Sequence, residues 1–251
     1  MNRSVFVSGI LVLFVVAGIA AQSEYDARPT SGTRSAANTG ADDTTTVQSV
    51  EDLYLSSAVT VETLGAQLLS PERTVQFLAL STLEHQIETG LIDPTNPEVL
   101  EALSPLVKQG VLVVSRGGDR SIEIYDPGVR REAVRVMGRL GTAPARASLV
   151  QTVRHDPEPT VRAEALFALA RIGHDPSGEV TRTIAGMMMN EHIQMFDEGV
   201  IYAAVTAIGE IAANPDSVVD PASREMLIHV ASDYRYSRMV RHLALDTLAR
   251  M

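Results

Sequence analysis

Two stretches of this 251-residue chain read DPGVRREAVRVMGRLG (residues 126–141) and DPEPTVRAEALFALARIG (residues 156–173). In both, a valine is followed four residues later by an alanine and after four more by a large apolar residue, and these positions share one face of an α-helix. The pattern occurs five times, and such recurrence is typical of helical repeat proteins. The five copies are Val75/Ala79/Leu83, Val129/Ala133/Met137, Val161/Ala165/Leu169, Val200/Ala204/Ile208 and Val240/Ala244/Leu248.

Local signals at both ends of the copies agree with helices. Asp126, Asp156 and Asp197 precede the second, third and fourth copies, where an aspartate side chain can accept hydrogen bonds from the free N–H groups of a first helical turn. Gly141 and Gly173 follow the second and third copies, and glycine favours the left-handed backbone that ends many helices. Because a second helix-compatible segment follows each of the first four copies, the sequence predicts an all-α solenoid of about five helical hairpins. These segments are residues 96–110, 144–155, 177–192 and 221–233.

The two quoted blocks resemble HEAT repeats, in particular the short HEAT-like type that also occurs in phycobilin lyases and in many bacterial scaffold proteins. The resemblance covers residues 70–251. It implies a ladder between repeats, formed by an aspartate in the turn and an arginine after the valine, and Asp126/Arg130 and Asp156/Arg162 occupy those places. The fourth copy departs from the pattern because Ile201 replaces the arginine.

One unit is longer than the others. Successive copies are 54, 32, 39 and 40 residues apart, against roughly 40 for a HEAT unit. The excess includes residues 110–125, where two β-prone runs flank a Gly-Gly turn and predict a short β-hairpin insertion or a long loop. Loops on rigid scaffolds often carry function, so Arg116, Asp119 and Arg120 at the tip are candidate partner-binding residues. A solvated insertion without a partner is an equally good interpretation.

The chain divides into three parts. Residues 1–21 combine Arg3, an apolar run and a small-residue exit, which predicts a signal peptide and a periplasmic or secreted protein. Residues 22–46 contain no Leu, Ile, Val, Phe or Met and predict a disordered linker. Residues 47–251 form the predicted repeat domain and open with a cap helix over 47–70. Its apolar runs are interrupted by charge, so we expect no stable membrane insertion once the leader is removed.

Composition and motifs argue against several functions. The net charge is −10 and residues 41–110 hold 11 acidic against two basic side chains, so we expect no nucleic-acid binding. There is no Cys, and the six histidines lie in different units without a paired ligand spacing, which predicts no metal site and no cofactor. No Gly-x-Ser-x-Gly motif occurs, and we expect no catalytic residues.

We therefore expect an exported HEAT-repeat scaffold that binds another protein in the cell envelope and is not an enzyme. The resemblance to phycobilin lyases raises an alternative, a ligand-binding or lyase/isomerase-type enzyme acting on a bound small molecule. The fifth copy has no following helix to cover Val240, Ala244 and Leu248 from one side. This predicts that the C-terminal helix docks onto a partner or self-associates.

Overall fold

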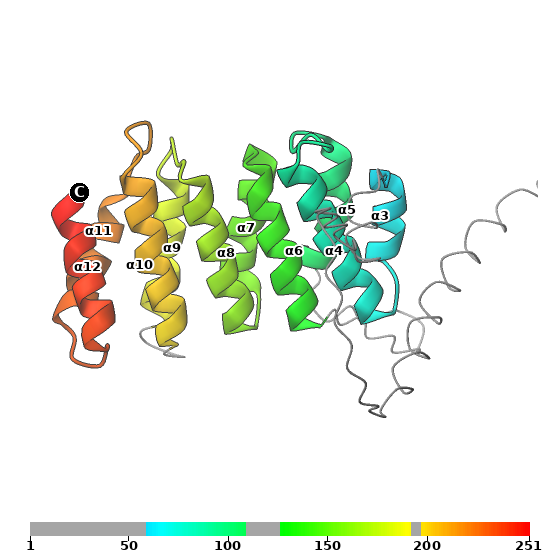
Figure 1. Cartoon of the computed structure of the whole chain (residues 1–251). Helices are drawn as coiled ribbons and strands as arrows, with labels where there is room; N and C mark the ends of the chain where they lie inside the picture. Colours follow the sequence, from blue (N-terminus) through cyan, green and yellow to red (C-terminus); the bar gives the residue numbers. More distant parts are fainter. Residues whose placement is uncertain (1–58, 109–125, 192–196) are drawn as a thin grey trace, which may run out of the picture. The chain divides into compact units, whose positions relative to one another are not determined.

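The computed structural model describes residues 59–108, 126–191 and 197–251, which belong to one compact unit, Val47–Met251. These residues form ten α-helices and no strand, so the all-α prediction is confirmed (Figure 1). The helices are α3 (Val61–Leu68), α4 (Arg73–Glu88), α5 (Pro97–Lys108), α6 (Pro127–Leu140), α7 (Ala143–His155), α8 (Pro159–Ile172), α9 (Glu179–Asn190), α10 (Glu198–Ala212), α11 (Pro221–Ser232) and α12 (Arg238–Arg250).

Several predicted features lie outside the described residues: the leader over 1–21, the linker over 22–46 and the hairpin over 110–125 with Arg116, Asp119 and Arg120. They stay predictions. Within the described ranges, no helix combines the length and the apolar character that crossing a bilayer requires.

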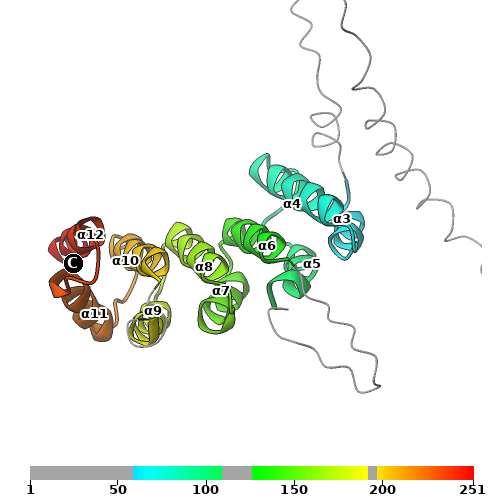
Figure 2. The same cartoon turned by 90° about the horizontal axis from the view of Figure 1, so that it is seen from below.

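The helices form two layers (Figure 2). The first layer contains the five stripe helices, which pack side by side in the order α4, α6, α8, α10 and α12. The second layer contains α3, α5, α7, α9 and α11 in the same order. Each helix therefore touches its neighbours in its own layer and a partner in the other, as expected for a stack of repeats.

The number of hairpins agrees with the sequence prediction, but their pairing does not. Among the helices of the second layer, each stripe helix packs most extensively on the one that precedes it, so the hairpins are α3–α4, α5–α6, α7–α8, α9–α10 and α11–α12. Val240 and Ala244 are fully buried because α12 packs against both α11 and α10. The expectation that this stripe lacks a cover was wrong, while self-association of α12 stays a prediction.

The stripes form the core, and their small residues set how closely the helices approach. All five central alanines of the repeated pattern are fully buried. A Cβ atom added to Gly138 of α6 would lie 2.7 Å from the Ala168 Cβ atom of α8. A Cβ atom on Gly209 of α10 would lie 3.2 Å from the hydroxyl of Thr247 on α12. Glycine and alanine at these positions therefore allow backbone contact between successive repeats.

The helix ends largely follow the sequence signals. Asp126 and Asp197 accept hydrogen bonds from the first turns of α6 and α10, and Gly141 and Gly173 end α6 and α8 with a positive φ. Asp156 differs, because its carboxylate accepts the Glu158 N–H just before α8 and also binds an arginine of the previous repeat.

That arginine is Arg130, and its buried ion pair with Asp156 is the predicted ladder contact between two repeats. Arg162 occupies the next rung but binds Glu191 instead of Asp197. Between α4 and α6 the links include Glu84, which contacts Arg135 and Arg139, and Arg73, which pairs with Asp126 at 3.2 Å. Ile201 ends the series with a fully buried apolar contact.

Candidate functional site

The exposed side of the second layer carries the described features best suited to binding. On α7, α9 and α11, exposed residues recur three or four positions apart, so each helix presents one stripe of side chains away from the core. The stripes are mixed in chemistry and contain charged, amide and apolar groups. They consist of Gln151, Arg154 and His155 on α7, Arg182, Gly186, Met189 and Asn190 on α9, and Arg224, Glu225 and Ile228 on α11.

An open groove of about 540 Å³ lies between the stripes of α7 and α9. Gly186 forms part of its surface, and a Cβ atom added there would meet no other atom within 4 Å. The missing side chain leaves room beside the buried Met187. The groove is lined by Val153, Arg154, His155, Arg162, Arg182, Thr183, Gly186, Met187, Asn190 and Glu191. We call it the α7–α9 groove.

Arg154 supplies the unneutralised charge of this groove. Its guanidinium donates a hydrogen bond of 2.6 Å to the Thr183 hydroxyl, which holds the side chain across the groove between α7 and α9. No carboxylate of the described residues forms an ion pair with Arg154. A guanidinium held in this way can bind a carboxylate or a backbone carbonyl of another molecule.

A buried ion pair lies at one side of the α7–α9 groove. The Arg162 guanidinium donates to the Glu191 carboxylate, and its other terminal nitrogen donates to the Asp156 carbonyl at 3.0 Å. Two atoms of this pair, Arg162 Nε and Glu191 Oε2, are buried without a hydrogen-bond partner. Each such atom favours a ligand that restores its hydrogen bond.

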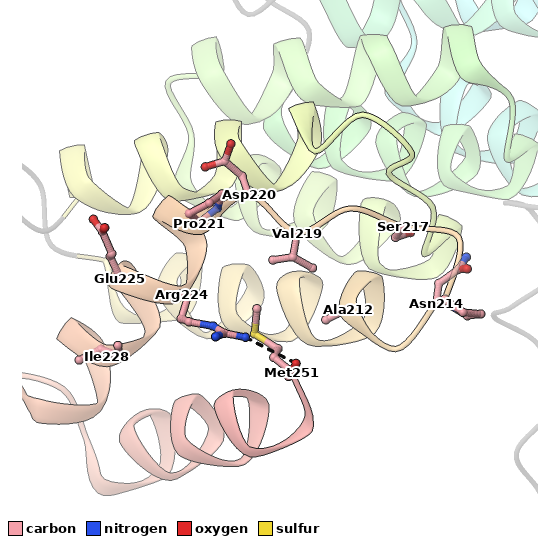
Figure 3. Close-up of a pocket in the computed structure, with 11 residues that line it drawn as sticks. Ala212, Asn214, Ser217, Val219, Asp220, Pro221, Arg224, Glu225, Ile228 and Met251 are labelled. Atoms are coloured by element: carbon pink, nitrogen blue, oxygen red, sulfur yellow. Dashed lines mark hydrogen bonds between the residues drawn. The ribbon is translucent and has the colours of Figure 1, made fainter.

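A second groove, of about 590 Å³, lies beside the first and is formed by the α10–α11 loop, α11 and Met251 (Figure 3). Val219 and Ile228 give it apolar surface, whereas Arg224 and Glu225 give it charge of both signs. We call it the α11 groove. Its opening is broad, so a ligand bound there would keep one side in solvent.

An ion pair joins the two grooves. Arg182 of the α7–α9 groove donates from Nε to the Asp220 carboxylate of the α11 groove at 2.8 Å. The Ala222 N–H and the Arg182 guanidinium both stabilise the charged carboxylate and hold the pKa of Asp220 below its usual range. Asp220 therefore stays ionised and neutralises Arg182 over most of the pH scale.

A polar clamp fixes the loops that precede α9 and α11. The Asp175 carbonyl accepts the Val218 N–H at 2.8 Å, and the Asp175 N–H donates to the Ser217 hydroxyl at 2.9 Å. The buried Asp175 carboxylate also binds the backbone and hydroxyl of Thr181, and the Asn214 amide donates to the Gly173 carbonyl. These contacts tie the α8–α9 loop to the α10–α11 loop.

The grooves offer positioning groups more than reactive ones. Their polar groups are mostly arginines, side-chain amides and carboxylates, and the carboxylates of Glu191 and Asp220 are already bound to arginine. In the described part of the chain no three His, Asp or Glu side chains gather as a metal site would require. His155 lines the α7–α9 groove without a second histidine beside it.

Comparison with protein-family models agrees with the repeat architecture. Residues 121–186, which include α6, α7, α8 and most of α9, match the model described as HEAT repeats. This segment therefore has the sequence of HEAT repeats. The match covers the two blocks whose sequence first indicated such repeats, and helical hairpins with the same packing continue on both sides of the matched residues.

Solved structures with similar folds include natural and engineered proteins. The complex of CpcE and CpcF of phycocyanin lyase from Nostoc sp. PCC7120 is 18% identical, with 74% of this chain and 96% of that chain covered and a TM-score of 0.46. A designed armadillo repeat protein in complex with the peptide (KR)4 is 20% identical, with 76% and 81% covered and a TM-score of 0.45. An engineered protein is 22% identical, with a TM-score of 0.43, and the match spans 76% of this chain but 47% of that protein. A search of curated proteins finds no match.

Sequence reasoning missed the groove residues. It selected Arg116, Asp119 and Arg120, which lie outside the described residues. Arg154 and Arg182 drew no notice because arginine on a helix surface is common. Gly186 was a usable signal, since a glycine inside a helical pattern lowers helix stability and often has a packing or functional reason.

Proposed function

We propose that this chain is an exported HEAT-repeat scaffold that binds another protein through the α7–α9 groove and the adjoining α11 groove. The observation that carries the proposal is Arg154, a guanidinium positioned by Thr183 beside the open surface at Gly186 and without a carboxylate partner among the described residues. Arginine is a frequent anchor of protein interfaces.

The charge pattern favours a partner segment that carries a carboxylate. Arg162 and Arg182 are already paired with Glu191 and Asp220, whereas Arg154 leaves one positive charge for the partner. The α11 groove next to it adds apolar surface at Ile228 and Val219. A segment with an acidic side chain followed by an apolar one would use both grooves, and two weak contacts on one rigid surface can add up to a specific one.

We propose no enzymatic activity. The grooves are broad and face solvent, and water exclusion, which most catalysis on small molecules needs, is absent from such a surface. The alternative, a ligand-binding or lyase/isomerase-type role on a small molecule, predicts a compound bound in stoichiometric amount. Native mass spectrometry of the purified protein tests it, because a bound compound would add a defined mass.

A pair of substitutions at Gly186 tests the protein-binding proposal. Gly186→Glu places a long acidic side chain in the α7–α9 groove near Arg154, whereas Gly186→Ala adds one methyl group in open space. Each variant and the unmodified chain would be used to capture partners from the native cell envelope, with quantification by mass spectrometry. We expect the same proteins to be recovered by the unmodified chain and Gly186→Ala, and at least about tenfold less of them by Gly186→Glu.

Equal recovery by all three proteins would show that the partner binds elsewhere. Arg154→Ala provides a second test that leaves the groove open and removes only the charge. Circular dichroism and thermal unfolding of each variant confirm that the fold is kept.

Export is tested separately. We propose that the leader over residues 1–21 is removed and that the mature protein is periplasmic or secreted. Intact mass of the protein isolated from cells, together with fractionation, measures both. A cytoplasmic protein that retains residues 1–21 would contradict this part of the proposal.

A further inference from the structure

The side of α12 that faces away from α10 has the residue pattern of an interior repeat interface. In the stripe helices, the residue nine positions after the repeated valine faces the next repeat, since a Cβ atom on Gly138 would touch Ala168 and one on Gly209 would approach Thr247. The residue five positions after the valine lies one turn away on the same side. In α12 these two positions are Leu245 and Ala249.

Leu245 is exposed where its counterparts are buried. The residues five positions after the valine in α4, α6, α8 and α10 are Leu80, Val134, Leu166 and Val205, and all four are 0% exposed. Leu245 is 50% exposed. An apolar residue is thus present at a position that the preceding four repeats bury against their neighbour.

Arg241 repeats the polar part of the same interface. Its counterparts Arg130 and Arg162 each bind a carboxylate of the next repeat, namely Asp156 just before α8 and Glu191 at the end of α9. Arg241 stacks on the Tyr234 ring, with 4.9 Å between its guanidinium carbon and the ring centroid, and its Nε is buried without a hydrogen-bond partner. No carboxylate of the described residues forms an ion pair with it.

The charge of α12 indicates which kind of molecule could bind its exposed side. The helix carries Arg238, Arg241 and Arg250 against one acidic residue, Asp246. Two copies of α12 placed against each other would bring these arginines together, which disfavours a symmetric pair of this chain. An acidic segment is favoured.

We propose that the face of α12 formed by Arg241, Leu245 and Ala249 binds a helix of another protein, which carries a carboxylate just before its first turn and small apolar residues at four-residue intervals. The partner would add to the array as one more repeat does, with its carboxylate on Arg241 and its apolar stripe on Leu245. This inference does not depend on the grooves of the second layer, and either proposal can fail without the other.

The chain itself supplies the probe. Residues 156–173 contain the carboxylate that binds Arg130 and the helix that covers α6. A fluorescent peptide of this sequence, acetylated and amidated, would be titrated with the full chain in an anisotropy measurement. We expect saturable binding that weakens about tenfold or more for Arg241→Glu and for Leu245→Asp. Met239→Ser is the matched control, because Met239 is a 65% exposed apolar residue on another side of α12.

A charge exchange tests the polar contact directly. The peptide with Asp156→Arg should bind the unmodified chain weakly and bind the Arg241→Glu chain better than the original peptide does. The proposal is overturned by a lack of saturable binding, or by equal binding to all variants. Sedimentation that shows a dimer lost in Leu245→Asp would overturn it in favour of a second copy as the occupant.

Discussion

The guanidinium of Arg130 and the carboxylate of Asp156 form two parallel hydrogen bonds, each 3.0 Å long, between α6 and the turn that precedes α8. Both side chains are almost fully buried, with 3% and 2% of their surface exposed. Removal of one partner leaves the other charged and desolvated. We expect Arg130→Met or Asp156→Asn to lower the free energy of unfolding by about 3–5 kcal/mol, measured by denaturant unfolding.

The double variant Arg130→Met/Asp156→Asn provides the test of coupling. It should cost less than the sum of the two single changes, since neither unpaired charge remains. The exposed pair of Arg182 and Asp220 is the control, because Arg182 is 65% exposed and its removal should cost at most about 1 kcal/mol. Similar losses at the two sites would contradict this interpretation.

Gly138 sets the approach of α6 to α8. Gly138→Ala would place its Cβ atom 2.7 Å from that of Ala168 and 3.1 Å from the Ala168 Cα atom, so the helices must separate. We expect a loss of about 1–3 kcal/mol in the free energy of unfolding. Ala168→Gly in the same chain should restore part of it. An unchanged melting temperature would show that the interface adapts freely.

Gly186→Ala should act in the opposite direction. Gly186 lies inside α9 and an added methyl group meets nothing within 4 Å. The substitution lowers the entropy of the unfolded chain without a clash, so we expect a gain of about 0.5–1 kcal/mol. Thermal unfolding measures it, and destabilisation would mean that the groove surface is tighter than the structure shows.

Glu164 of α8 predicts a dependence of stability on pH. Burial disfavours its charged form and raises the pKa of its carboxyl, although Arg171 and Arg131 act in the other direction. A raised folded-state pKa stabilises the fold below the ordinary pKa of glutamate, and this contribution is lost as the pH rises through the folded-state pKa. We expect Glu164→Gln to be more stable than the original chain at pH 7 and equally stable at low pH, as measured by melting temperature.

Much of the fold could be predicted from the sequence because helical periodicity and end signals are local. The stripe through Ala133 and Ala165 and the glycine ends at Gly141 and Gly173 fixed both the helices and their buried faces. Pairing could not be predicted in this way. Periodicity shows which face of α12 is buried but not whether the preceding or the following helix covers it.

The ladder of ion pairs could also be predicted only in part, because some of its partners come together only when the helices are packed. The sequence indicated arginine and aspartate at the right positions, and Arg130 and Asp156 indeed pair. It did not indicate Glu191 as the partner of Arg162, because a glutamate at the end of α9 looks like an ordinary surface residue until the helices are placed. Similarly, the sequence could not identify Arg154 as a candidate binding residue, because Thr183 and Gly186 come next to it only in the folded structure.

The clamp around Asp175 has a consequence for recognition. It joins the loops before α9 and α11 through backbone and side-chain hydrogen bonds, so these two helices are held at a fixed spacing, and the Arg154–Thr183 hydrogen bond links α7 to α9. A ligand that reaches from Arg154 to Ile228 would meet a surface already in its bound geometry and would lose little affinity to ordering of the receptor. The fixed separation between these two side chains would then favour partners whose own acidic and apolar residues lie the same distance apart.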